Sequence, residues 1–530
     1  MTTSTSTPNS PERFYVTTSI PYVNGEPHLG HALELVQADV LARHRRLRGA
    51  QVRFLTGTDD NALKNVTAAR EAGVDVREFV DANARRFAGL RDTLTLSTDD
   101  FIRTSADPRH APGVERLWRQ CAARGDFYRR RYEGLYCAGC EQFYTSDELV
   151  EGRCTEHGTT PELVAEENWF FRLSKYAGQL LRLIESSTVR IEPAPKRREV
   201  LAFIRAGLAD FSVSRPAARA AGWGVPVPDD PEQVVYVWWD ALTNYVTALD
   251  YGTGGVAYRD WWHGSDARVH VIGKGIVRFH AVYWLALLLS AGQPLPTTIF
   301  VHDYLSAEGA KISKSAGTTV DPVQLAERYG TDALRWWFVR EVPRVGDTDF
   351  TVDRLAARHD GELANGLGNL VNRSLALVHK FRDGRVPDGA GATHGDRTGA
   401  GAATTALTGT LTGACQALPG RIDHALAVFD LRTATDAVWR VVDEANRLVE
   451  TARPWELARR EREDGASRRD LDEVLAALVR ACRLLASELV PFIPDGAARL
   501  AAQLGEGTRI EQPVPTFLRL DRAPVLSLGR

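Results

Sequence analysis

The chain contains little lysine. Lysine and arginine together number 65, and only seven of these are lysine, which leaves 58 arginines. Two of the seven lie three residues apart in the segment Lys311-Ile312-Ser313-Lys314-Ser315. A lysine ammonium is a mobile point charge, whereas the guanidinium of arginine is a rigid planar fork. The segment therefore indicates a loop that follows charge developing on a phosphate group; taken alone, it is also compatible with a solvated loop.

Cysteine is sparse as well, and its spacing argues against a disulfide framework. Of the six cysteines, Cys121, Cys415 and Cys482 are scattered and fit ordinary buried thiols. The other three form two chelating pairs with a histidine, Cys-x2-Cys and Cys-x2-His, which is the spacing of a tetrahedral zinc site. With four ligands such a site has no open position for water, so its role would be structural. The predicted zinc ligands are Cys137, Cys140, Cys154 and His157.

Long apolar runs are missing too. No stretch approaches the ~20 apolar residues of a membrane-spanning helix, and residues 1–13 lack the hydrophobic core of a secretory signal. We therefore expect a cytoplasmic protein with no membrane partner. The formal net charge of −3 is too small to attract nucleic acid over the whole surface, so any RNA contact must use local arginine-rich faces.

Two histidines stand at the start of a predicted helix. The apolar run 14–20 is typical of a strand, and the amphipathic segment 33–47 is typical of a helix. Between them, His28 and His31 are spaced i, i+3, so they share one face beside the partly positive helix N-terminus. Gly30 leaves room for a ligand to reach the backbone. This arrangement favours phosphate binding, although histidines at this spacing are often structural.

These segments occur in the order of a known family. His28-Leu29-Gly30-His31 resembles the HIGH motif, and Lys311-Ile312-Ser313-Lys314-Ser315 resembles the KMSKS motif, of class I aminoacyl-tRNA synthetases. The resemblance runs from about Phe14 to near the C-terminus. The segments between the motifs look like those of methionyl-tRNA synthetases: Ile20-Pro21-Tyr22-Val23-Asn24-Gly25, Phe54-Leu55-Thr56-Gly57-Thr58-Asp59, Asn168-Trp169-Phe170-Phe171-Arg172-Leu173-Ser174, Tyr236-Val237-Trp238-Trp239-Asp240-Ala241 and Ile272-Gly273-Lys274-Gly275-Ile276.

The resemblance implies ATP-dependent activation of L-methionine to methionyl-adenylate, followed by transfer to the 3′ end of tRNA(Met). Mg²⁺ would accompany the ATP, and some members of the family carry a similar zinc knuckle. The implied catalytic residues are His28, His31, Lys311 and Lys314. The implied ATP-binding residues are His28, Gly30, His31, Lys274, Lys311, Ser313, Lys314 and Ser315.

The resemblance also implies a methionine pocket. Asp59 would hold the substrate ammonium, and apolar and aromatic side chains would surround the thioether, which gains from sulfur–ring contacts. Such walls also suit leucine, because an apolar pocket separates ligands by only about 1–3 kcal/mol per methylene. The implied methionine-binding residues are Ile20, Tyr22, Asp59, Trp238, Ala241, Leu242, Tyr245, Ile276 and His280.

The chain departs from the family near this pocket. Most members read Glu-His-Gly where this chain has Asp60-Asn61-Ala62, and many have aspartate at the position of Gly275. We expect methionine preference to persist, with an altered response to inhibitors of this site. Two alternatives remain: a catalytically weak paralogue that binds RNA or regulates, and a class I ligase for another apolar amino acid. Both histidines and both lysines are retained, which favours the enzyme, and the short insertion leaves little room for an editing domain.

The order of patterns predicts an α/β fold, with a doubly wound, Rossmann-like parallel sheet, a zinc-knuckle insertion and a C-terminal helical bundle. Gln233–Trp238, Val269–Ile272 and Thr298–His302 are predicted to continue the sheet after the insertion. The predicted parts are the first half of the catalytic domain (14–120), the connective insertion (121–224), the second half of the catalytic domain (225–305), the KMSKS loop with a stem-contact element (306–360) and an anticodon-binding domain (361–530).

Helical periodicity dominates from Gly361 onward, and 383–405 is rich in Gly, Ala, Thr and Asp, which predicts a flexible connection. The resemblance implies that Asn369, Arg373 and Trp455 contact the anticodon, because such side chains stack on and pair with splayed bases. Core packing is the alternative for Trp455. No module follows the bundle before Arg530, so we expect a monomer.

Overall fold

The protein is described from a computed structural model that covers residues 11–137, 142–155, 158–307, 310–311, 320–388 and 400–520. The chain forms two compact units. Unit 1 comprises residues 1–92 and 96–304, and unit 2 comprises residues 93–95 and 305–530. Each unit is described by itself.

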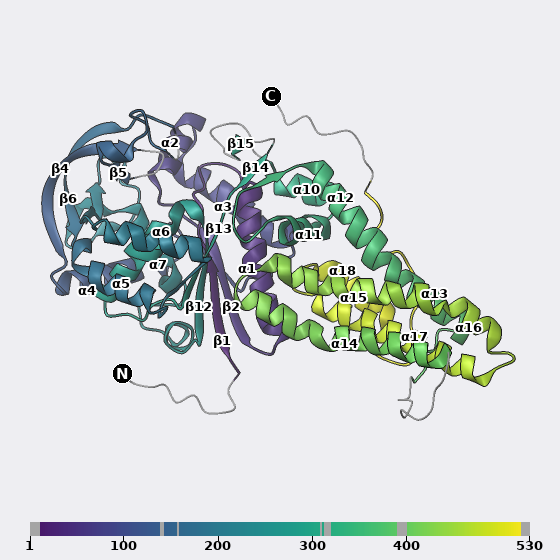
Figure 1. Ribbon diagram of the computed structural model, residues 1–530. Helices are drawn as coiled ribbons and strands as arrows, with labels where there is room; N and C mark the ends of the chain where they lie inside the picture. The colour runs from purple at the N-terminus through teal and green to yellow at the C-terminus, as the bar shows by residue number, and fades with distance from the viewer. Residues whose placement is uncertain are drawn as a thin grey trace. The chain divides into compact units, whose positions relative to one another are not determined.

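A six-stranded sheet organises unit 1 (Figure 1), and every pair of neighbouring strands in it is parallel. This confirms the predicted α/β, Rossmann-like sheet. Its order is β3 (Asp100–Arg103), β2 (Gln51–Thr58), β1 (Arg13–Thr18), β12 (Ala267–Gly273), β13 (Thr298–His302) and β7 (Arg190–Glu192).

Both faces of the sheet are covered. Along β1, Thr18 lines a cavity beside α1 (Leu29–Leu47) and α3 (Val76–Thr93). Tyr15, on the opposite face, donates to the Tyr245 carbonyl of α7 (Val237–Thr247) at 2.8 Å. Strands buried on both faces are apolar almost without alternation, and Phe14–Thr18 are all buried. Because β1 lies between β2 and β12, the carboxyl ends of β1 and β12 flank the switch point, where doubly wound sheets bind ligands.

One predicted strand of the sheet is wrong. Residues 230–235 form β11 (Asp230–Val235), but it lies antiparallel between β10 (Pro226–Val227) and β9 (Ser214–Pro216) in a separate three-stranded sheet. From Val237 the chain is helical, as α7. The apolar run that suggested one strand therefore belongs partly to the central strand of this small sheet and partly to a buried helix, which periodicity alone does not separate. The short β7 at the sheet's edge was not predicted.

The insertion holds a four-stranded sheet in the order β5 (Gln142–Tyr144), β4 (Phe127–Cys137), β6 (Glu162–Phe171) and β8 (Phe211–Ser212). β4 and β6 pair antiparallel from Phe127↔Phe171 to Tyr136↔Glu162. The remaining helices of unit 1 are α2 (Leu63–Ala72), α4 (His110–Ala123), α5 (Ala177–Glu185), α6 (Ala194–Arg205), α8 (Val256–Tyr258), α9 (Leu285–Ser290), the 3₁₀ turns η1 (Ser146–Glu148), η2 (Leu173–Tyr176) and η4 (Lys274–Ile276), and the π-helical η3 (Arg259–His263) and η5 (Phe279–Trp284).

Unit 2 is mainly helical, which confirms the predicted C-terminal helical region. Its sheet has the order β15 (Ala310–Lys311), β14 (Leu305–Ala307) and β16 (Thr348–Phe350). Its helices are α10 (Pro322–Tyr329), α11 (Thr331–Glu341), α12 (Val352–Arg358), the π-helical η7 (His359–Gly368), α13 (Asn369–Arg382), α14 (Ala400–Ala427), α15 (Leu431–Ala452), α16 (Pro454–Arg460), α17 (Gly465–Glu488) and α18 (Pro494–Leu504).

The predicted connection 383–405 is too long at its C-terminal end, because α14 already begins at Ala400. Alanine is the strongest helix former, and the run of alanines from Ala400 offsets the neighbouring threonines. Among the helices in the described part of the chain, none is long and apolar enough to cross a membrane.

Candidate active site

The two histidines cap α1 with their own rings. His28 has extended backbone angles and its Nδ1 accepts a hydrogen bond from the Gly30 N–H at 3.1 Å. The Nδ1 of His31 accepts from the His28 N–H at 3.0 Å. The two rings stack with centroids 3.7 Å apart. Because both Nδ1 atoms accept, the proton of each neutral ring is on Nε2, the nitrogen farther from the helix backbone.

The role predicted for Gly30 changes in one respect. A Cβ at this position would lie 3.0 Å from Cε1 and 3.1 Å from Nδ1 of His28. The missing side chain therefore makes room for the His28 ring to fold over the helix start, rather than for a ligand alone.

The loop after β2 carries Asp59, which is 1% exposed. Its N–H donates to the Pro21 carbonyl at 2.9 Å, and Tyr22 and Asp59 form an isolated parallel bridge. The loops that follow β1 and β2 are thus joined through the backbone. The structure brings Asp59 and Tyr22 together at the carboxyl edge of the sheet.

Asp60 is completely buried and belongs to the framework of this loop. Its carboxylate accepts from Arg103 Nε at 3.0 Å, Ser105 Oγ at 2.8 Å and Thr58 Oγ1 at 2.7 Å. Burial raises the pKa of Asp60, while the nearby Arg103 charge opposes that rise. The next residues also fit the fold without glycine, because Ala62 has φ −63° and ψ 138°, an extended conformation that any residue adopts.

The helix α7 supplies Trp238, Ala241, Leu242 and Tyr245 from one stretch of chain. The Trp238 ring stacks on Phe279 with centroids 3.6 Å apart and meets the Tyr22 ring edge-on at 6.3 Å. Ile20 and Ile276 pack against the same core. Phe279, which sequence reasoning missed, lies one residue before His280, and its signal was the aromatic cluster Phe279–Trp284.

His280 is buried beneath this wall. Its Nδ1 faces the Ile276 carbonyl at 2.9 Å and therefore carries the hydrogen, so Nε2 accepts from the Tyr245 hydroxyl at 2.7 Å. Burial lowers the pKa of His280 to about 4, and burial raises the pKa of Tyr245. Both groups are therefore uncharged at neutral pH.

A second buried histidine, which sequence reasoning missed, lies beside His280, with ring centroids 6.3 Å apart. His270 of β12 accepts from Trp284 Nε1 at 3.2 Å and places its Nδ1 2.7 Å from Thr17 Oγ1. Burial lowers the pKa of His270 as well. The available signal was a polar residue inside the apolar strand 269–272.

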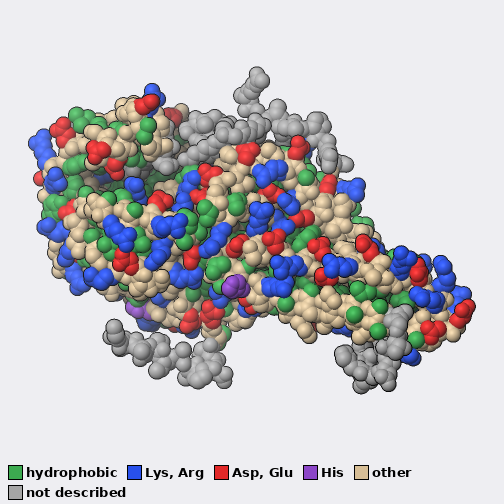
Figure 2. Space-filling model, viewed as in Figure 1, with side chains coloured by type: hydrophobic (Ala, Val, Ile, Leu, Met, Phe, Trp, Pro, Cys, Tyr) green, Lys and Arg blue, Asp and Glu red, His purple; other side chains and the backbone are tan. Residues whose placement is uncertain are grey.

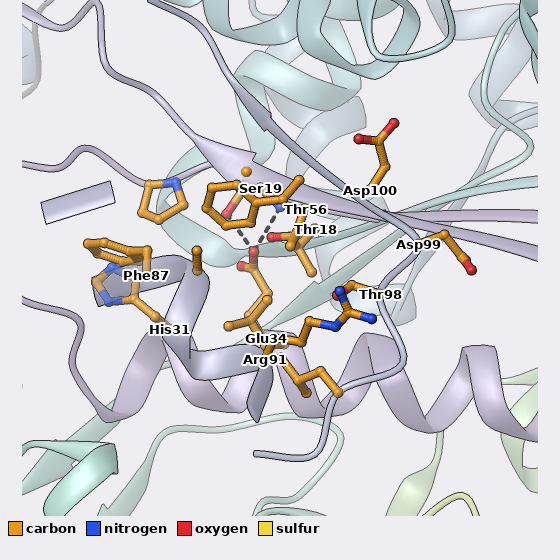
Figure 3. A pocket seen from close by; sticks show the side chains of 16 residues that line it. Thr18, Ser19, His31, Glu34, Thr56, Phe87, Arg91, Thr98, Asp99 and Asp100 are labelled. Atoms are coloured by element: carbon orange, nitrogen blue, oxygen red, sulfur yellow. Dashed lines mark hydrogen bonds between the residues drawn. The ribbon is translucent and has the colours of Figure 1, made fainter. Parts of the chain in front are cut away.

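Glu34 and His302 form a further buried pair. Glu34 accepts from the Ser19 N–H at 2.8 Å and lies 2.9 Å from His302 Nε2. The pair joins α1 to the carboxyl ends of β1 and β13. Beside it, between the sheet and α1 and α3, lies a cavity of about 340 Å³ (Figure 3), lined by Thr18, Ser19, Pro21, His31, Glu34, Leu35, Thr56, Gly57, Phe87, Ala88, Arg91, Leu96, Thr98, Asp99, Asp100 and Phe101.

The lysine positions are described only in part. Lys274 opens η4 after β12, and its ammonium lies 4.6 Å from the centre of the Tyr304 ring. Lys311 ends β15 in unit 2, paired with Ser306. Ser313, Lys314 and Ser315 lie outside the described residues, as does the side chain of Lys311.

Half of the predicted zinc ligands are described. Cys137 and Cys154 are each 1% exposed and pack in one cluster with Tyr144. Cys140 and His157 lie outside the described residues. Within the described part of the chain no group of three His, Cys, Asp or Glu side chains could hold a metal ion.

The residues predicted to contact the anticodon lie in unit 2. Asn369 opens α13, and one turn later Arg373 donates to Asn446 Oδ1 at 2.7 Å. Trp455, on α16, is 43% exposed, which argues against core packing. On the face shown in Figure 2, Lys and Arg side chains are interspersed with Asp and Glu, as the small net charge implies.

The family model described as "tRNA synthetases class I (M)" matches residues 14–159 and 145–375. The sheet, the histidine-capped helix and this match place the chain among the class I aminoacyl-tRNA synthetases. It is 38% identical to the methionine–tRNA ligase of Caldanaerobacter subterraneus subsp. tengcongensis, over 96% of this chain and 79% of that protein. It is 39% identical to that of Brucella suis biovar 1, over 96% and 98%.

Among solved structures, Mycobacterium tuberculosis methionyl-tRNA synthetase in complex with methionyl-adenylate matches with a TM-score of 0.87 and 37% identity, over 96% of this chain and 100% of that one. The chain therefore belongs to the methionyl-tRNA synthetase family, and its activity is that of a methionine–tRNA ligase.

Proposed function

We propose that the two substrates of adenylation meet above the switch point of the sheet. The observation that carries this proposal is that His28 follows β1, Asp59 follows β2 and Lys274 follows β12, so all three lie at the carboxyl edge. The methionine carboxylate attacks the α-phosphorus of ATP, and pyrophosphate leaves. The protein supplies no nucleophile, so its work is positioning and stabilising charge.

The histidines and lysines would bind the phosphates. The Nε2–H groups of His28 and His31 are suited to donate to phosphate oxygens at the N-terminus of α1, beside Gly30. Lys274, Lys311 and Lys314 would neutralise the departing pyrophosphate, with Ser313 and Ser315 on the same loop. Mg²⁺ is the expected companion of ATP and would offset charge on the phosphates.

Methionine would bind with its ammonium at Asp59 and its side chain against the wall of α7. The wall is aromatic and uncharged, because His280 is neutral and hydrogen-bonded to Tyr245. Such surroundings fit a thioether, which has no charge and gains from contact with rings. The side-chain wall comprises Ile20, Tyr22, Trp238, Ala241, Leu242, Tyr245, Ile276 and His280.

The proposed site is tested by amino-acid-dependent ATP–pyrophosphate exchange with all twenty amino acids. Methionine should support exchange far better than leucine. Asp59→Asn should raise the KM for methionine strongly and the KM for ATP little, because only methionine carries an ammonium. A KM for methionine unchanged in this variant would contradict the role of Asp59, and preference for leucine would contradict the pocket.

The connective insertion would hold one structural zinc ion. Two of its four predicted ligands, Cys137 and Cys154, are buried in one small cluster, as a shared ion requires. Metal analysis of protein purified without added metal should give about one zinc per chain. Zinc-free protein that is stable and active would contradict the assignment.

In unit 2, Asn369, Arg373 and Trp455 would read the anticodon of tRNA(Met), with 361–530 as the anticodon-binding domain. We also propose that 306–360, with the KMSKS loop, contacts a stem of the tRNA and that the protein acts as a cytoplasmic monomer. Trp455→Ala should reduce tRNA charging about 5- to 150-fold, because one base–aromatic stack contributes about 1–3 kcal/mol. ATP–pyrophosphate exchange should be unchanged; equal loss of both activities would instead indicate damage to the fold.

A further inference from the structure

The loop that carries Asp59 is fixed from the β3 side. Thr104 Oγ1 accepts from the Asp60 N–H at 2.9 Å and from the Asn61 N–H at 3.3 Å. Trp223 Nε1 donates to the Asp60 carbonyl at 2.8 Å. These bonds hold the backbone of the loop, but they do not set its distance from α7, which is a separate element.

The helix α7 is fixed from the opposite side, by a histidine of α4. His110 is fully buried, and its Nε2–H donates to Asp240 Oδ1 at 2.9 Å. Its Nδ1 lies 2.9 Å from Thr247 Oγ1. Asp240 is in the first turn of α7 and Thr247 is its last residue, so one imidazole holds both ends of the helix that forms the pocket wall.

Asn61 connects the loop that carries Asp59 to helix α7. Its Nδ2 donates to the second carboxylate oxygen of Asp240, Oδ2, at 2.8 Å. Directly after it, Ala62 packs against Tyr236 and Val237 at the start of α7. Asp240 is 1% exposed and carries both hydrogen bonds, so the loop and the helix are joined through one buried carboxylate.

We infer that Asn61 is a positioning residue that sets the spacing between Asp59 and the side-chain wall on α7. Methionine engages both parts at once, so its affinity depends on that spacing, whereas a ligand that engages only one part is insensitive to it. The inference rests on the proposed roles of Asp59 and α7. Through its hydrogen bond to Asp240, Asn61 holds the Asp59 loop and helix α7 at the distance at which one methionine molecule contacts both.

The chemistry of the amide fits this role. One oxygen of Asp240 accepts from His110, and the asparagine amide supplies a donor for the other oxygen at the δ position. An aspartate at position 61 would place a second carboxylate against the first. A histidine could also donate to Asp240 from Nδ1, because this nitrogen is bonded to Cγ, as Nδ2 of asparagine is.

The test compares two ligands by isothermal titration calorimetry. L-methionine engages both halves, and 4-(methylthio)butanoate has the same thioether chain without the ammonium. In Asn61→Ala, the dissociation constant of methionine should rise about tenfold, as expected for loss of one hydrogen bond to a charged acceptor. That of 4-(methylthio)butanoate should change less than about twofold, and Asn61→His should restore methionine affinity.

Control variants separate this effect from loss of stability. Asp126 is another fully buried carboxylate of unit 1, with hydrogen bonds from Lys175, Tyr176 and Ser290. Asp126→Asn should lower the melting temperature while leaving both dissociation constants unchanged. An equal rise for both ligands in Asn61→Ala, an unchanged methionine affinity, or failure of Asn61→His to restore it would overturn the inference. If the proposed role of Asp59 in binding the ammonium were wrong, the wild-type protein would bind L-methionine and 4-(methylthio)butanoate equally, so that failure is recognised separately.

Discussion

Unit 1 contains two pairs of histidines that differ in exposure, in hydrogen-bond partners and in surroundings. His28 and His31 are partly exposed at the start of α1, stacked on each other, with Nδ1 bound to the backbone. His270 and His280 are buried under the α7 wall, and their pKa values are lowered by that burial. The same side chain therefore caps a partly exposed helix start in one pair and is buried and neutral in the other; we propose phosphate binding for the first pair and support of the methionine pocket for the second.

We expect substitutions in the two histidine pairs to change different properties, the rate of adenylation for one pair and the stability of the fold for the other. On the proposed function, His28 and His31 would meet charge that exists only while pyrophosphate leaves, so their loss should reduce the rate of adenylation. Groups on the buried side touch each other and the framework, so their loss should change stability and its dependence on pH.

The largest effect is expected for Lys314, whose proposed partner is the departing pyrophosphate. Lys314→Ala should lower the adenylation rate about 10²–10³-fold, by analogy with loss of one donor that stabilises transition-state charge. Single-turnover adenylate formation measures it. Lys314→Arg should recover only part of the rate, because a rigid guanidinium does not replace a mobile ammonium. An arginine variant equal to wild type would contradict the reasoning from lysine scarcity.

His31→Asn should act on the same step, with an expected loss of about 10²-fold. The variant retains an acceptor at the δ position, which keeps the bond to the His28 N–H, and removes the donor at Nε2. Circular dichroism melting is the control and should shift little. If the rate were unchanged, the histidine pair would serve the helix cap alone.

On the buried side, His280 should make stability depend on pH. Its pKa is about 4 in the folded protein and about 6.5 when unfolded. The stabilising contribution is therefore complete above pH 6.5 and is lost as the pH falls toward 4. Between pH 7 and pH 5 the loss amounts to about 2 kcal/mol of unfolding free energy.

Urea unfolding of wild type and His280→Gln at both pH values measures this term, because other titrating groups cancel in the difference. The variant should lose less stability than wild type on acidification. Identical losses would show that His280 is charged in the folded protein.

The smallest effect is expected for Gly30→Ala, which tests how closely the open pair is packed. The new Cβ would press on the His28 ring at 3.0 Å, so the ring must move by a few tenths of an ångström. Helix propensity would favour alanine by about 0.5–1 kcal/mol. We therefore expect unchanged or slightly higher stability with a rate loss below about tenfold. A variant with wild-type rate would mean that the ring position is not critical.

The sequence predicted local elements better than their partners. Strand β1, helix α1 and the spacing of His28 and His31 follow from a few neighbouring residues, and the structure confirms them. By contrast, residues 233–238 were assigned to the wrong sheet, because the partner strands β9 and β10 lie in a segment without strong periodicity. His270, Glu34 and His302 were missed because their contacts join residues far apart in the chain. The predicted roles of Lys314 and Cys140 stay predictions.

The capped start of α1 has a further consequence for how a phosphate arrives. The Gly30 N–H, which would otherwise await an anion, is already bound to the His28 ring. A phosphate that bound this N–H would have to break an existing bond, and such an exchange contributes little net affinity; on the proposed function the phosphate instead accepts from the two Nε2–H groups, with the cap left in place. We therefore expect the helix start to bind phosphate weakly through its backbone, which favours a ligand held by several side chains over free inorganic phosphate.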